Sequence, residues 1–144
     1  MKLLVPSLIA SLLALSGCTS SGSRQFTEKT FENMYLRGVF TWWEADESFK
    51  LTLIEDGLYF ATAKLIADGQ PYDFKFSDAD WTPEYSCGSL QAEGQVLVLK
   101  DEQVAKCEAD SGNFQFTPSE TGTYEFYINV AAPLSPRVYI QRSN

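Results

Sequence analysis

The sequence predicts an all-β protein with the fold of an antiparallel sandwich, and three observations support this. Short segments that alternate apolar and polar residues follow one another from Met34 to the C-terminus, as strands that bury one face do. Turns that contain glycine and aspartate separate these segments at short intervals. No segment has the apolar spacing of a long amphipathic helix. About eight strands are expected, which favours a sandwich, with a barrel as the alternative.

Residues 1–17 are expected to be a secretory signal peptide. Lys2 gives a short positive start, residues 3–15 are an apolar run, and Leu-Ser-Gly precedes Cys18. This ending resembles the lipobox of bacterial lipoproteins, which implies that Cys18 is acylated, for example with palmitate, and becomes the first mature residue. The apolar run is shorter than the ~20 residues that a membrane-spanning helix needs. We therefore expect a lipid anchor at Cys18, with an ordinary signal peptide as the alternative.

Residues 18–32 are expected to form the lipidated tether, and residues 33–144 the β-sandwich domain. The run 19–24 is small and polar, as flexible linkers are. Phe26 and Phe31 belong either to a first strand or to a short segment packed on the outside. Thr19, rather than aspartate, follows the cysteine, and by resemblance to Gram-negative lipoproteins this implies the outer membrane, on its periplasmic or its exposed side.

The two remaining cysteines are expected to form one disulfide. Export places the chain in an oxidising compartment, and Cys87 and Cys107 are then an even pair. A reactive thiol pair is the alternative, but these cysteines lack the C-x-x-C spacing. The formal net charge of −8 repels phosphate backbones, so nucleic acid is not an expected partner.

Each expected strand follows from local periodicity. The expected strands are 34–40, 49–53, 58–65, 72–76, 95–100, 112–117, 123–130 and 137–141. In strand 72–76, Tyr72, Phe74 and Phe76 should face the core, and Lys75 should face outward. Strand 95–100 is apolar on both sides at its centre, which predicts burial of both faces.

The residues that most catalytic and metal sites require are missing. The chain contains no histidine, which removes the commonest general base and the commonest zinc ligand. The carboxylate pairs fall in expected turns, where aspartate bonds its own backbone, so we expect no catalysis. Asp78 and Asp80 could offer oxygen ligands to calcium, but no EF-hand spacing follows, and a solvated acidic turn is favoured. No cofactor is expected.

Aromatic residues exceed what one core of this size requires. The chain has three tryptophans, seven tyrosines and ten phenylalanines, and several fall in loops or at strand ends. Since neighbours in an extended strand point to opposite faces, one of Trp42 and Trp43 is expected to be buried. Sugar rings stack on exposed aromatic faces while polar groups bond their hydroxyls. The candidate glycan-binding residues are Trp42, Trp43, Lys75, Asp80, Trp81 and Tyr85.

The segment 34–43, which reads MYLRGVFTWW, resembles the opening of the starch- and glycogen-binding immunoglobulin-like modules found beside amylases, pullulanases and branching enzymes. The E-D-G turn at 55–57, the Y-x-A-x-x-x-L strand and the Y-x-F-K-F strand that leads to D-W keep the order of that family. The resemblance covers about residues 33–142 and implies an immunoglobulin-like antiparallel β-sandwich.

Family members that bind starch use a tryptophan that matches Trp43, a lysine that matches Lys75 and a further aromatic residue, for which Trp81 is the nearest match. The sequence departs from the family at Thr41 and Trp42, where polar residues such as asparagine are usual, and in its cysteine pair. Many modules of this fold bind no sugar, so the fold alone does not carry the function.

Two hypotheses of function follow. The first is a membrane-anchored, non-catalytic lipoprotein that binds a glucan-like carbohydrate. The alternative is a protein-interaction lipoprotein, an accessory subunit or pilot of an outer-membrane assembly, whose aromatic patch or open sheet edge binds an envelope protein. A glycan and an envelope protein are thus the two partners that the sequence leaves open, besides the membrane.

Overall fold

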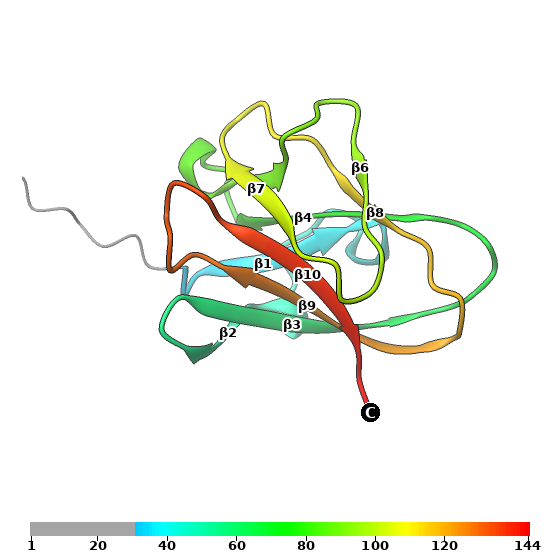
Figure 1. Cartoon of the computed structure of the whole chain (residues 1–144). Helices are drawn as coiled ribbons and strands as arrows, with labels where there is room; N and C mark the ends of the chain where they lie inside the picture. The colour runs from blue at the N-terminus through cyan, green and yellow to red at the C-terminus, as the bar shows by residue number, and fades with distance from the viewer. Residues whose placement is uncertain (1–30) are drawn as a thin grey trace, which may run out of the picture.

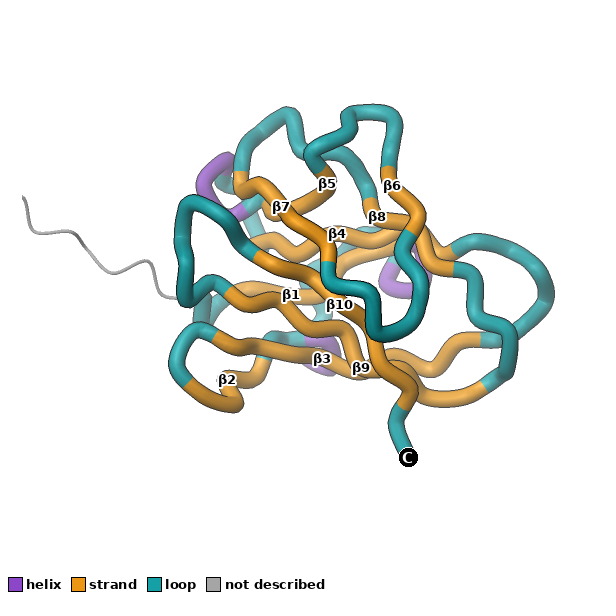
Figure 2. The backbone as a smooth tube through the Cα atoms, viewed as in Figure 1, coloured by secondary structure: helices purple, strands orange, loops and turns teal. Residues whose placement is uncertain are grey.

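The computed structural model describes residues 31–144, so the predictions of a signal peptide, of lipid on Cys18 and of the tether up to residue 30 lie outside the described residues. The described part is all-β, with ten strands and three one-turn 3-10 helices (Figures 1 and 2). The strands are β1 (Met34–Gly38), β2 (Thr52–Glu55), β3 (Leu58–Leu65), β4 (Tyr72–Asp78), β5 (Cys87–Ser89), β6 (Gln95–Val96), β7 (Gln103–Cys107), β8 (Phe114–Phe116), β9 (Gly122–Asn129) and β10 (Arg137–Arg142). The 3-10 helices are η1 (Val39–Thr41), η2 (Glu47–Phe49) and η3 (Pro83–Tyr85). Between residues 31 and 144 no helix has the length and apolar character that crossing a bilayer requires.

The strands form a β-sandwich of two sheets that are joined at one corner, which confirms the predicted fold class. The first sheet contains β1, β4, β5, β8 and β6, and the second contains β2, β3, β9, β10 and β7 in that order. β10 crosses in front of β1 in Figure 1, with the core between the two layers. Pairing is antiparallel except between β6 and β8, which run parallel.

β4 is the central strand of the first sheet. One edge of β4 pairs with β1, from Met34 opposite Asp78 to Gly38 opposite Phe74. The other edge is shared by β8 and β5, which pair with its first and second halves. Because β4 has neighbours on both edges, Phe74 and Phe76 are fully buried as predicted, whereas Tyr72 at its start is only partly buried.

The core is rich in aromatic rings contributed by both sheets. The ring centroid of Phe74 lies 4.9 Å from that of Phe126 on β9 and 5.6 Å from that of Phe114 on β8. The predicted alternation of the strand at 58–65 is confirmed, since every second residue from Tyr59 is buried. Phe31 is 3% exposed and packs on Tyr59 and Tyr85, so packing begins before the boundary expected at residue 33.

The prediction of a doubly buried strand at 95–100 is wrong. Only Gln95 and Val96 form β6, which pairs with β8 and lies at the edge of the first sheet. Leu97 points into the core, but Val96 is 67% exposed and Val98 is also exposed. The strand expected at 49–53 is also displaced. Phe49 ends η2, and β2 begins at Thr52.

The predicted disulfide is confirmed and lies where the two sheets meet. Cys87 on β5 and Cys107 on β7 face each other directly in the strand register and are bonded. β7, for which no strand was predicted, pairs through Gln103 and Val104 with β10 and through its last residues with β5. The disulfide therefore ties the first sheet to the strand that connects it with the second.

Reduction of this disulfide should destabilise the domain. A bond that closes a loop with a sequence separation of 20 contributes about 3 kcal/mol by restricting the unfolded chain. Urea unfolding with and without dithiothreitol measures this difference. The Cys87→Ala/Cys107→Ala variant is the control, because reductant should leave its unfolding unchanged. Equal free energies of unfolding for the oxidised and reduced wild-type protein would contradict the account.

Candidate functional site

Two tryptophans that are far apart in sequence meet on the outer face of the first sheet. After Gly38 the chain reverses in η1 and runs back beside β1, where Lys50 bridges to Tyr35. This return places Trp43 near Trp81, which lies in the turn between β4 and η3. Their ring centroids are 6.3 Å apart, and the ring planes are inclined at 43°.

Arg37, which was not among the predicted site residues, lies between the two loops that carry these rings. Its side chain is on the outer face of β1 and is only 4% exposed. The Nε atom donates a hydrogen bond to the carbonyl oxygen of Trp43 at 2.7 Å, and Nη2 donates to the same oxygen. Nη1 donates to the carbonyl oxygens of Asp78 at 2.8 Å and Ala79 at 3.2 Å. A lone arginine among the apolar residues of 34–40 was the sequence signal that could have identified it.

The guanidinium of Arg37 also packs on Trp81. Its Cζ atom lies 3.9 Å from the centroid of the Trp81 ring, a distance typical of a cation–π contact. Burial lowers the pKa of Arg37, while the nearby Glu44 and Asp78 carboxylates oppose this shift. Arginine nevertheless stays charged in proteins, so the electrostatic attraction between the guanidinium and the ring is retained.

Lys75 lies next to Arg37 across the β1–β4 pairing. Its side chain is on the outward face of β4 as predicted, but it is 9% exposed, because neighbouring segments cover it. Its Nζ donates to the carbonyl oxygen of Ser111 at 2.8 Å and lies 5.9 Å from the centroid of the Trp81 ring. Burial is the main cause of the lowered pKa of Lys75, and the negative charge of Asp110 opposes this shift. We call the group formed by Arg37, Trp43, Lys75 and Trp81 the aromatic cradle.

All three tryptophans have left-handed backbone conformations. The φ angles are 54° at Trp42, 61° at Trp43 and 56° at Trp81. This region costs an L-residue about 1–2 kcal/mol, and strained residues of this kind concentrate at functional sites. Because Trp42 and Trp43 are not in an extended strand, the prediction that one of them is buried is wrong. Trp42 is 87% exposed, and Trp43 is partly buried.

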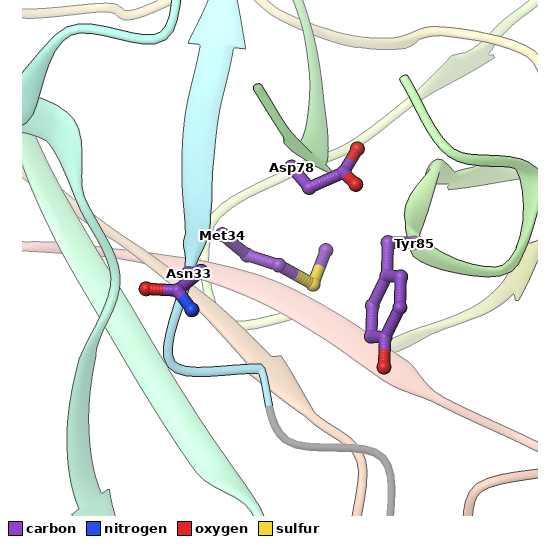
Figure 3. Close-up of a pocket in the computed structure, with 4 residues that line it drawn as sticks. All are labelled: Asn33, Met34, Asp78 and Tyr85. Atoms are coloured by element: carbon purple, nitrogen blue, oxygen red, sulfur yellow. The ribbon is translucent and has the colours of Figure 1, made fainter. Parts of the chain in front are cut away.

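Three predicted site residues, Trp42, Asp80 and Tyr85, lie outside the aromatic cradle. Tyr85 ends η3 and packs against the core, with its ring 5.7 Å from that of Phe31. It lines a cavity of about 220 Å³ together with Asn33, Met34 and Asp78 (Figure 3). Asp80 is an exposed residue of the turn that carries Trp81.

One aspartate of the acidic segment at the end of β4 has a structural role. The Asp78 carboxylate accepts a hydrogen bond from the backbone N–H of Thr82 at 2.8 Å, which closes the turn. Within residues 31–144 no three histidine, cysteine, aspartate or glutamate side chains are grouped so that they could hold a metal ion.

Comparison with known proteins gives a likeness in structure alone. No family model matches the chain, and no curated protein matches it in sequence. Among solved structures, the ligand-induced structure of AmyP-SBD, a starch-binding domain, has a TM-score of 0.55 and 13% sequence identity. The likeness covers 96% of this chain and 97% of that chain. At this identity it shows that the two proteins share a fold.

Gly88 on β5 makes room for the lysine of the aromatic cradle, and Gly88→Ala should destabilise the domain. A Cβ atom at Gly88 would lie 2.1 Å from the carbonyl oxygen of Gly112 and 2.9 Å from Cε of Lys75. Overpacking against backbone costs about 1–3 kcal/mol, and we expect the upper end of that range, because a carbonyl cannot rotate away. Urea unfolding measures the loss.

Gly69→Ala is a suitable control for this substitution. Gly69 has a φ of +82°, but a Cβ there would meet nothing within 4 Å. It should therefore cost only the left-handed backbone term of about 1–2 kcal/mol. A smaller loss for Gly88→Ala than for Gly69→Ala would show that β5 yields without strain and that Gly88 is not needed for space.

Proposed function

We propose that this domain is a non-catalytic carbohydrate-binding module whose ligand is a glucan-like chain. The observation that carries the proposal is the pair of inclined rings, Trp43 and Trp81, held at the surface by strained backbone and a buried arginine. Rings of this kind suit the C–H faces of sugars, which stack on aromatic side chains. The fold shared with a starch-binding domain supports the same assignment.

The inclination of the two rings favours a curved ligand. Ring planes inclined at 43° cannot both stack on one flat face, so a chain that stacks on both rings must bend between them. An α-1,4-linked glucan bends in this way, whereas a flat β-1,4-linked ribbon would contact one ring at a time. Asp80, the exposed neighbour of Trp81 in sequence, can bond the hydroxyl groups, whereas the buried Lys75 donates to the Ser111 carbonyl oxygen.

Binding should depend on both rings of the aromatic cradle. Trp81→Ala and Trp43→Ala are each expected to weaken binding of maltoheptaose or β-cyclodextrin about tenfold or more, which corresponds to about 1.4 kcal/mol. Cellohexaose should bind the wild-type protein weakly. Isothermal titration calorimetry on the mature protein, in a detergent whose head group is not a sugar, measures these affinities.

Tyr139→Ala provides the matched control. Tyr139 is a partly exposed ring on the outer face of the second sheet, where it stacks on Tyr127 with centroids 4.6 Å apart. Its removal should leave glucan affinity unchanged. Absence of any glucan binding by the wild-type protein, with tryptophan fluorescence unmoved, would overturn the proposal. Recovery of an envelope protein that is lost on Trp42→Ala would then favour a protein-interaction lipoprotein.

We further propose that lipid on Cys18 anchors the domain to the outer membrane. The proposal rests on the Leu-Ser-Gly-Cys ending of the apolar run, as described above. Each buried methylene of an acyl chain contributes about 0.8 kcal/mol, so several chains on one residue hold a protein at a bilayer. Cys18→Ala should abolish labelling by radioactive palmitate and move the protein out of the outer-membrane fraction. Unchanged fractionation and labelling would contradict the anchor.

A further inference from the structure

Arg37 connects the two loops that carry the rings. The loop after β1 holds Trp43, and the turn after β4 holds Trp81. No backbone hydrogen bond among the described residues joins residues 41–44 to residues 79–82. The guanidinium bridges them, because Nε and Nη2 donate to the loop after β1 while Nη1 donates to the carbonyl oxygens of Asp78, the last residue of β4, and Ala79, the first residue of the turn.

The same guanidinium limits the position of the Trp81 ring. With Cζ 3.9 Å from its centroid, one face of the ring lies on a planar cation that is 4% exposed. Trp81 is still 38% exposed, so part of the residue stays open to solvent. The cation thus supports the ring from beneath and leaves its exposed part for a ligand.

We propose that Arg37 is a positioning residue that fixes Trp43 and Trp81 in their binding geometry before any ligand arrives. The role of the rings as a glycan site rests on the proposed function, whereas the positioning itself does not. Ligand-independent order of this kind increases affinity because no loop has to be ordered on binding.

A lysine cannot replace Arg37 in this position. Its ammonium is a point charge on a flexible stem, whereas the guanidinium is planar and offers donors in several fixed directions. Arg37→Lys keeps the positive charge but can bond one of the two loops at a time, and it offers no flat surface to the indole. It should therefore loosen the rings without removing a charge from the sheet.

Fluorescence quenching tests the positioning without any ligand. In a Trp42→Phe/Trp43→Phe background, Trp81 is the remaining tryptophan of the chain. Adding Arg37→Lys should raise the acrylamide quenching constant of Trp81 about twofold, because the planar cover is lost. In the protein with all its tryptophans, Arg37→Lys should weaken maltoheptaose binding about tenfold.

Arg137→Lys is the matched control, since Arg137 is a half-exposed residue of β10 that pairs with Glu102 at 3.9 Å. It should change neither quenching nor binding. If Arg37 only stabilised the fold, Arg37→Lys would lower the urea midpoint and leave the quenching of the folded protein unchanged. Unchanged quenching overturns the proposal whatever the binding result. If Arg37→Lys raises quenching but the wild-type protein binds no glucan, the positioning role of Arg37 is upheld and the proposed function is overturned.

A measurement on the wild-type protein decides the matter if Arg37→Lys does not fold. The Nε–H of Arg37 is held by the Trp43 carbonyl oxygen, so its NMR signal should exchange with water at least about tenfold more slowly than those of Arg137 and Arg142. Equal exchange rates for the three arginines would show that the guanidinium is not held and would overturn the proposal.

Discussion

The buried guanidinium of Arg37 is the interaction on which the outer face of the first sheet depends. A strand residue supplies the charge, and two loops supply the carbonyl oxygens that accept its hydrogen bonds. Hydrogen bonds to a charged donor are about twice as strong as neutral ones, so they can offset backbone strain. The left-handed conformations of Trp43 and Trp81 are therefore compatible with a stable fold, and the rings stay at the surface.

β4 serves the core and the proposed site at the same time. Its inward residues, Phe74 and Phe76, are fully buried between the sheets. Its outward Lys75 lies beside Arg37 and near the Trp81 ring, and the strand ends in the turn that carries Trp81. The strand is held on both edges, and the disulfide fixes β5 beside it. Packing of the sandwich thus sets the geometry of the aromatic cradle.

Strands with strong alternation could be predicted from the sequence, as β3, β4, β9 and β10 show, and so could the disulfide. The apolar run at 95–100 was misplaced because local composition does not say whether a strand lies at the centre or at the edge of a sheet. β7 was missed because its pairing is divided between two sheets. The left-handed backbone conformations of the tryptophans and the role of Arg37 depend on contacts between residues far apart in sequence, and no local sequence pattern indicates them.

The central claim is that Trp43 and Trp81 together bind a curved glucan. The most direct test is a titration of the isotope-labelled mature protein with β-cyclodextrin, followed through its indole and backbone N–H signals. We expect the largest shifts at the indole N–H groups of Trp43 and Trp81 and in the turn that contains Asp80. Shifts confined to the exposed edge around Val96, or no shifts at all at saturating ligand, would contradict the account.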